Sequence, residues 1–168
     1  MAHRENRGDL HQSFSLKLAW IRNAEEAQSQ DHIIEFGSGQ IIKASAAPQY
    51  MGSQDKINPE ESLLAAISAC HMLSFLTVAR KMRLEVISYS DNTTAKLGKN
   101  RDNRIAITHI TMAPQVSFKS CDTVSEARLA KMHHIAHNNC FIANSLSSDV
   151  QIDMHNSSAT IPTDNKLI

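Results

Sequence analysis

A long apolar segment begins at Asn58-Pro59-Glu60-Glu61 and continues to about Arg83. Asparagine is a preferred residue just before a helix, proline is favoured at the first helical position, and acidic side chains stabilise the positive end of the helix dipole. The body of the segment is apolar on nearly every side, which is typical of a helix covered on several sides rather than of an amphipathic surface helix. We therefore predict a long, buried central helix.

The segments around this helix show the two-residue alternation of apolar and polar side chains that is typical of half-buried strands. Two of them frame Gly37-Ser38-Gly39 as a hairpin. In a later segment the parity of the apolar positions changes near Thr108–His109, which indicates one inserted residue, a β-bulge. The expected strands are residues 14–20, 32–36, 40–46, 84–97, 105–118 and 150–154.

Two further helices are expected near the end of the chain. One runs from about Asp122 to His137, and a shorter one covers residues 140–146. Strands on both sides of the helices, without a regular alternation of strand and helix, indicate an α+β fold rich in antiparallel sheet. We expect a single domain over residues 1–168, with its core at about 12–155 and loosely ordered tails at 1–10 and 157–168.

The composition argues against several classes of partner. The chain has 17 basic and 17 acidic side chains, so no strong electric field attracts nucleic acid or an anionic membrane surface. Aromatic residues make up only 5% of the chain, which is few for a base-stacking surface. The basic N-terminal residues precede no apolar stretch, and the apolar run 63–79 is short and interrupted by polar residues. We expect a cytoplasmic protein that binds neither nucleic acid nor membrane.

The three cysteines, Cys70, Cys121 and Cys140, are widely spaced and odd in number, which favours reduced thiols over a disulfide framework. Cys70 lies in the middle of the long helix, where most cysteines are simply small apolar side chains. As a nucleophile it would need a cation from elsewhere in the fold, because it lacks the helix N-terminus that commonly lowers a thiol pKa. Cys140 follows the second helix and is expected to be the better exposed, unless it packs beneath the turn. Cys121 is expected to be structural.

A metal site is the alternative use of the residues near Cys140. His133, His137 and Cys140 lie at positions i, i+4 and i+7, and nitrogen and sulfur ligands suit zinc. This set offers three local ligands at most, without a Cys-x-x-Cys or His-Glu-x-x-His partner. The simpler interpretation is a polar helix face that ends in histidine, whose charge complements the helix dipole. We expect no metal and no other cofactor.

Three segments, taken together, resemble one protein family. Residues 58–72, NPEESLLAAISACHM, look like the Asn-Pro-Glu-Glu-Leu-x-x-Ala-x-x-Ala-Cys signature of the OsmC/Ohr family, the osmotically inducible and organic hydroperoxide resistance proteins. Residues 137–146, HNNCFIANSL, resemble the segment that holds the family's second cysteine. Residues 45–52, SAAPQYMG, resemble the loop that leads into its central helix. The resemblance spans roughly residues 12–155 in the same order.

The resemblance implies an OsmC-like fold, an intertwined homodimer and a thiol-dependent peroxidase. In that mechanism the Cys70 thiolate attacks an organic hydroperoxide and becomes a sulfenic acid, and Cys140 then condenses with it to a disulfide. A dithiol reductant, of the lipoyl type in relatives, would reopen the disulfide by exchange. The apolar surroundings of Cys70 suit an organic hydroperoxide better than hydrogen peroxide. The activity would belong to oxidative-stress defence.

The family also has a glutamate ten residues before the nucleophile and an arginine in its N-terminal strand region. Glu60 matches the glutamate, but ten residues of helix span about 15 Å, so Glu60 would act through a partner subunit or a mediating side chain. Arg22 is the candidate for the arginine, although its neighbours do not match the family motif, and Gln30 stands where some relatives carry it. The alternative reading is therefore an OsmC-like stress or small-ligand-binding protein with little peroxidase activity.

Overall fold

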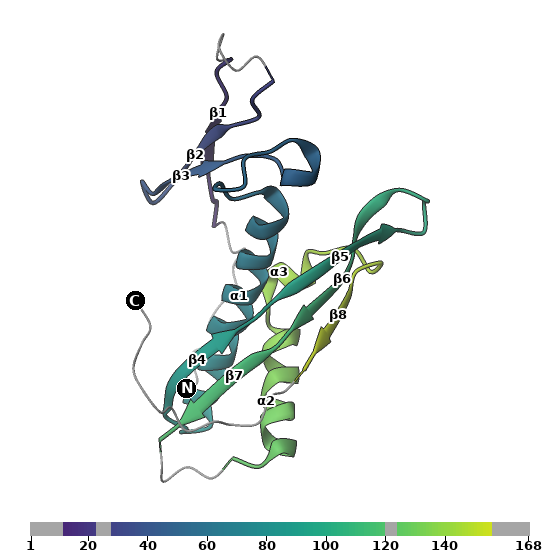
Figure 1. Cartoon of the computed structure of the whole chain (residues 1–168). Helices are drawn as coiled ribbons and strands as arrows, with labels where there is room; N and C mark the ends of the chain where they lie inside the picture. The colour runs from purple at the N-terminus through teal and green to yellow at the C-terminus, as the bar shows by residue number, and fades with distance from the viewer. Residues whose placement is uncertain (1–11, 23–27, 120–123, 156–168) are drawn as a thin grey trace. The chain divides into compact units, whose positions relative to one another are not determined.

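The computed structural model describes residues 12–22, 28–119 and 124–155, which form two compact units (Figure 1). The first unit lies within residues 1–61 and the second within residues 62–168. Cys121, the start of the second predicted helix and the two predicted tails lie outside the described residues. That the whole chain forms a single domain stays a prediction.

The first unit contains an antiparallel sheet in the order β1-β2-β3, made of β1 (Leu16–Ala19), β2 (His32–Phe36) and β3 (Ile41–Ala44). The predicted hairpin is confirmed, since β2 and β3 pair across a turn in which Gly39 has a φ of 84°, a conformation that favours glycine. The expectation that the first strand is half-buried is wrong, because all of β1 is exposed. Alternation identifies the apolar face of a strand, but it does not supply the element that covers it.

The long helix α1 (Pro59–Lys81) begins as the sequence predicts. The Asn58 side chain accepts a hydrogen bond from the Glu61 backbone N–H at 2.8 Å, and the Glu61 carboxylate accepts one from the Asn58 N–H at 3.1 Å. This reciprocal pair is a capping box, which satisfies two backbone donors that a helix start leaves open. The helix ends where Arg83 adopts a left-handed φ of 58°.

The second unit holds two sheets. One pairs β4 (Val86–Asp91) with β7 (Pro114–Phe118), and the other has the order β5-β6-β8, from β5 (Thr94–Lys99), β6 (Ile105–Met112) and β8 (Gln151–Met154). The predicted continuous strands 84–97 and 105–118 are therefore each divided between two sheets. Asp91 stabilises the crossing from β4 to β5, where the chain passes from one sheet to the other. Its carboxylate accepts hydrogen bonds from the Thr93 hydroxyl at 2.7 Å and from the Ala113 N–H at 2.8 Å.

The predicted bulge is confirmed. Lys96 pairs with His109 and Leu97 pairs with Ile107, so Thr108 is the additional residue in β6. The bulge reverses which face the later side chains occupy, and Ile110 and Met112 become fully buried. The last strand, β8, is also confirmed, and it pairs parallel with β6.

The other two helices are α2 (Glu126–Asn138) and α3 (Phe141–Asn144). The described part of α2 begins at Glu126, later than predicted, because Ser125 accepts a hydrogen bond from the Arg128 N–H at 3.3 Å and caps the helix. In Figure 1 the long strands of the second unit pass in front of α1 and α2. A core cluster that includes Phe75 of α1, Val116 of β7 and Met132 of α2 joins these elements.

Within one chain, α1 is buried along one face only, so the expectation of cover on several sides is wrong for a single copy. The buried positions recur at helical spacing: Ile67, His71, Phe75, Val78 and Ala79. On another face Leu73 is 61% exposed. When a helix is apolar on every side, its sequence does not indicate which of its faces pack against the rest of its own chain.

By length and composition α1 would also suit a membrane span, in contrast to the expectation from the shorter run 63–79. Its most apolar window has a mean hydropathy of 1.8. A single such helix is weak evidence, because core helices of globular proteins meet the same criterion. One face of α1 packs into the core of the second unit, which accounts for the apolar side chains on that face.

Candidate active site

The fold brings Cys70 and Cys140 together, although they are far apart in sequence. Cys70 lies in the middle of α1, and Cys140 lies between α2 and α3, where it is the residue that caps α3. The two side chains pack in one apolar cluster with Ile67, Ile110 and Met112, and Cys70 contributes to raising the pKa of Cys140. Both cysteines are free thiols. The arrangement places a potential nucleophile in contact with a potential resolving thiol.

The two thiols differ in accessibility, in the opposite sense to the sequence-based expectation. Cys140 is completely buried, whereas Cys70 is only partly buried. Burial, followed by the hydrogen bond with Cys70, raises the pKa of Cys140 to about 11. The Cys140 sulfur also accepts a hydrogen bond from the Ala143 N–H at 3.4 Å. At neutral pH Cys140 is therefore a protonated, enclosed thiol, and Cys70 is the one that a reagent can reach.

Cys70 lines an apolar groove of about 750 Å³ in the second unit. One wall is the open face of α1, and the other is formed by the end of α2 and the start of α3, including Ile135, Phe141 and Ile142. Phe141 is 77% exposed, so the groove is open on the surface of the single chain. An apolar groove with one thiol in its wall suits an organic molecule that reacts with sulfur.

The residue after Cys70 belongs to a buried histidine pair that the sequence analysis did not recognise. His71 Nε2 lies 3.0 Å from His133 Nδ1 of α2, and the two side chains are 1% and 2% exposed. Burial lowers the pKa of each ring to about 4, and a neighbouring histidine, His137 for His71 and His71 for His133, disfavours the charged form further. Both rings are uncharged at neutral pH, so this pair does not supply a cation to Cys70.

The spacing of α2 contained the signal for this pair. His133 lies between Met132 and Ala136, both of which are fully buried, so it belongs to the apolar face of the helix. The alternative of a zinc site from His133, His137 and Cys140 does not fit this arrangement, because His133 binds His71 and Cys140 packs against Cys70. In the part of the chain that the structure describes, no three His, Cys, Asp or Glu side chains form a metal-binding group.

Asp91 ties α1 to the sheets one turn from this pair. Ser68, two residues before Cys70, donates a hydrogen bond of 2.6 Å to the same carboxylate that holds the β4–β5 crossing. This bond helps to hold the rotation of α1 in which Cys70 lines the groove and His71 is buried in the core.

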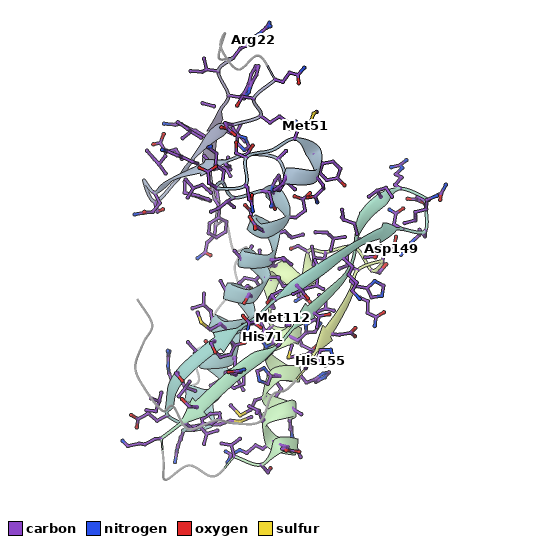
Figure 2. All side chains as sticks on the ribbon, in the orientation of Figure 1. Arg22, Met51, His71, Met112, Asp149 and His155 are labelled. Carbon is purple, nitrogen blue, oxygen red and sulfur yellow. The ribbon has the colours of Figure 1, made fainter. Side chains whose placement is uncertain are left out.

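Glu60 and Arg22 both belong to the first unit. One carboxylate oxygen of Glu60, Oε2, is buried and has no hydrogen-bond partner among the described residues. Arg22 is exposed beyond the end of β1, and Figure 2 shows its side chain pointing away from the β1–β3 sheet. The roles predicted for these two residues, like those of the cysteines, stay predictions.

The comparisons with known proteins agree with this geometry. A family model described as OsmC-like protein matches residues 52–155, which include both Cys70 and Cys140. A solved structure of an OsmC-like protein of unknown function from Vibrio cholerae is 37% identical, covering 87% of this chain and 99% of its own, with a TM-score of 0.82. The chain belongs to the OsmC-like protein family. The predicted family and its α+β fold, with antiparallel sheets and a long central helix, are confirmed.

More distant members share the fold. An OsmC-like protein from Mycoplasma pneumoniae has 14% identity and a TM-score of 0.71, covering 90% of this OsmC-like chain and 100% of its own. An organic hydroperoxide resistance protein from Elizabethkingia anophelis has 13% identity and a TM-score of 0.70, covering 87% and 96%. At these identities the likeness shows the fold alone. No curated protein matches the sequence.

Proposed function

We propose that this OsmC-like protein is a thiol-dependent peroxidase that reduces organic hydroperoxides in oxidative-stress defence. The observation that carries the proposal is the contact between an accessible thiol, Cys70, and an enclosed thiol, Cys140, in the wall of an apolar groove. Membership in a family that includes organic hydroperoxide resistance proteins supports it. Since both cysteines work as thiols, we propose that the protein acts in the reducing environment of the cytoplasm.

The first step uses Cys70. Its thiolate sulfur attacks one oxygen of the hydroperoxide, so that an S–O bond forms and the O–O bond breaks. The departing alkoxide takes a proton and leaves as the alcohol, while Cys70 becomes a sulfenic acid. The apolar groove favours this chemistry for hydroperoxides with an organic chain, because burial of that chain contributes about 25 cal/mol per Å².

The second step uses Cys140. Its sulfur attacks the sulfur of oxidised Cys70, forming an S–S bond and releasing the hydroxyl group, which leaves with a proton as water. Because the two side chains already pack in one cluster, this step competes well with further oxidation of the sulfenic acid. An external dithiol, of the lipoyl type in relatives, then supplies two electrons and returns both cysteines to thiols.

Glu60 and Arg22 complete the proposed site as organiser and cation. A buried carboxylate oxygen that accepts no hydrogen bond destabilises a fold. Glu60 Oε2 is such an oxygen among the described residues, which supports the idea that a second copy supplies its donor. A guanidinium would satisfy this oxygen, and the resulting Arg–Glu pair would favour the Cys70 thiolate of a partner subunit, since about 15 Å of helix separates Glu60 from Cys70 of its own chain. Arg22 is the candidate for that guanidinium.

We propose that the protein is an intertwined homodimer. Large apolar side chains are exposed in each unit, and exposed apolar surface commonly marks an interface. They include Leu16, Leu18, Trp20, Ile41, Leu73 and Phe141. The open apolar face of α1 needs cover that a single chain does not provide. Obligate dimers bury about 2,000 Å² or more in such interfaces.

The alternative is an OsmC-like stress or small-ligand-binding protein with little peroxidase activity. One observation favours it: among the described groove-lining residues, none next to Cys70 carries a positive charge. A thiol without a cation reacts slowly, because the thiolate is the nucleophile. An apolar groove of this volume would still bind a small organic ligand.

Thiol loss on addition of cumene hydroperoxide distinguishes the two. The peroxidase consumes one equivalent of hydroperoxide and loses the Cys70 and Cys140 thiols together, and a dithiol restores them and allows turnover. Cys70→Ser, which is nearly isosteric, is the control and should consume none while remaining folded. If the fully reduced, folded protein keeps its thiols in excess hydroperoxide, the peroxidase proposal is wrong and the binding function is favoured.

A further inference from the structure

A second, smaller cavity, of about 220 Å³, is formed by α2 and β8 in the second unit. Its lining consists of Ala130, His133, His134, His137, Ile152 and Met154. Ile135 and Asn139, which line the groove beside Cys70, each lie two residues after a histidine of this cavity. Two residues turn a helix by about 200°. The cavity therefore lies on the face of α2 opposite the groove, and the open face of α1 takes no part in it.

His133 presents a nitrogen to this cavity that no described residue satisfies. Its Nδ1 lies 3.0 Å from His71 Nε2, so its own Nε2 is on the far edge of the ring. The side chain is 2% exposed, and Nε2 has no hydrogen-bond partner among the described residues. His71 does not line the cavity, so the cavity is on the Nε2 side of the His133 ring. A buried nitrogen without a partner destabilises a fold, which favours a ligand at this point.

The contacts of His133 also orient it as a metal ligand. When His133 Nδ1–H donates its hydrogen bond to His71 Nε2, the lone pair of His133 Nε2 stays free. Histidines that bind metal ions commonly donate their other ring N–H to a neighbouring group in this way, which fixes the tautomer and the ring orientation. Phe75 stacks on the His133 ring at a centroid distance of 4.4 Å and holds its plane.

Two further donor groups line the same cavity. His137 follows His133 by one helical turn, a spacing that places both imidazoles on one face of α2, and Met154 of β8 supplies a thioether. His134 is less available, because its Nε2 accepts a hydrogen bond from the Asn138 amide at 3.2 Å. The available donor set is therefore two imidazoles and one thioether.

This donor set discriminates between metal ions. The described residues that line the cavity include no acidic side chain, so Mg²⁺ and Ca²⁺ lack the carboxylate ligands that they prefer. No three His, Cys, Asp or Glu side chains of the described chain form a metal-binding group, which leaves the usual ligand set of zinc incomplete. A thioether beside imidazoles is a soft set that favours Cu(I).

We propose that His133, His137 and Met154 bind one Cu(I) ion in the cavity between α2 and β8. Met154 takes the place that the sequence-based zinc alternative gave to Cys140, which packs against Cys70 instead. The inference departs from the sequence-based expectation of no metal. It is also independent of the proposed peroxidase chemistry, since the site uses no thiol and lies on the opposite face of α2 from the groove.

Titration with Cu(I) in the absence of oxygen, in competition with the coloured chelator bicinchoninate, tests the proposal. Cys70→Ser, treated with iodoacetamide, is the background, so that accessible thiols do not compete for copper. One Cu(I) per chain should bind. His137→Gln and Met154→Leu should each weaken binding about tenfold or more, because loss of a residue that merely orients a metal ligand already costs about 10- to 100-fold.

Two substitutions are matched controls, and circular dichroism establishes that every variant is folded. His134→Gln removes an imidazole from the same cavity, and Met51→Leu removes an exposed thioether of the first unit. Both should keep the background affinity. An equal loss in either control shows adventitious binding by exposed side chains and overturns the inference. Unchanged binding in both His137→Gln and Met154→Leu, or no Cu(I) bound in the background protein, also overturns it.

X-ray absorption at the copper edge gives a readout that does not depend on the folding of the cavity variants. In the background protein the Cu(I) ion should have imidazole nitrogen neighbours together with one sulfur. A shell of sulfur alone would place the ion on residual thiols and contradict the proposed site.

Discussion

His71 and His133 join the two main helices of the second unit through a hydrogen bond of 3.0 Å between Nε2 and Nδ1 (Figure 2 labels His71). The ring of His133 also stacks on Phe75 at a centroid distance of 4.4 Å. On their outer sides, His71 Nδ1 and His133 Nε2 have no partner among the described residues. The pair is enclosed directly behind Cys70, so its charge state bears on the stability of the helix that carries the nucleophile.

This pair predicts a loss of stability in mild acid. The folded pKa of each ring, about 4, lies below the ordinary value of 6.5, so the unfolded chain takes up protons first as the pH falls. The stabilisation is complete above pH 6.5 and declines towards pH 4, by up to about 1.4 kcal/mol per pH unit for each ring.

Chemical denaturation at several pH values measures this effect. His134→Gln, at an exposed position of α2, is the control and should keep the wild-type pH dependence. His133→Phe should flatten it by about half. A free energy of unfolding that is constant between pH 7 and pH 4 would contradict the assignment of neutral, buried rings.

The difference in burial predicts the order in which the thiols react. In the folded, reduced protein iodoacetamide should label Cys70 well before Cys140, because Cys140 is fully buried and its pKa is raised to about 11. Mass spectrometry of a time course identifies the labelled residue, and the unfolded protein, in which both react, is the reference. Preferential labelling of Cys140 would reverse the proposed roles.

The two-step mechanism predicts distinct products in Cys140→Ser. One equivalent of hydroperoxide should oxidise Cys70 to a sulfenic acid that a dimedone probe traps, and excess hydroperoxide should convert it to the sulfinic acid. Multiple turnover with a dithiol should be strongly reduced, since no intramolecular disulfide forms. Wild-type turnover in this variant, measured as alcohol released per chain, would remove Cys140 from the mechanism.

The proposed cation predicts slower alkylation in Arg22→Ala. A nearby positive charge favours a thiolate, typically by about one to three pKa units, so its removal should slow the reaction of Cys70 at neutral pH by tenfold or more. Lys17→Ala removes another exposed positive charge of the first unit and is the control. A pH profile of alkylation that is the same in Arg22→Ala and in the wild type would exclude Arg22 from the site.

The exposed apolar residues predict an obligate dimer. Analytical ultracentrifugation at micromolar concentration should show a dimer, and Leu18→Gln should shift it towards monomer because it removes apolar contact area. Lys17→Gln, at the adjacent position of β1 and already polar, should leave the assembly unchanged. A stable, folded wild-type monomer would count against the dimer and against a site completed by a second copy.

Features that depend on neighbouring residues could be predicted from the local sequence. The helix start capped by Asn58, the hairpin around Gly39 and the bulge near Thr108 all follow from local backbone chemistry and two-residue alternation, and all three are present. The segments around Cys70 and Cys140 identified the family, because each motif is a continuous stretch of sequence that can be recognised without knowing its neighbours in space.

Features that depend on residues distant in the chain became apparent only in the folded structure. Residues 84–97 alternate without interruption, so nothing in the sequence indicated that the chain changes sheet near Asp91. The change depends on distant residues, because Asp91 accepts hydrogen bonds from Ser68 and the Ala113 N–H. Position after a helix suggested that Cys140 is exposed, yet packing against Ile67 and Cys70 encloses it. Burial is a property of what surrounds a residue, and for these side chains the surroundings come from elements that the sequence places far away.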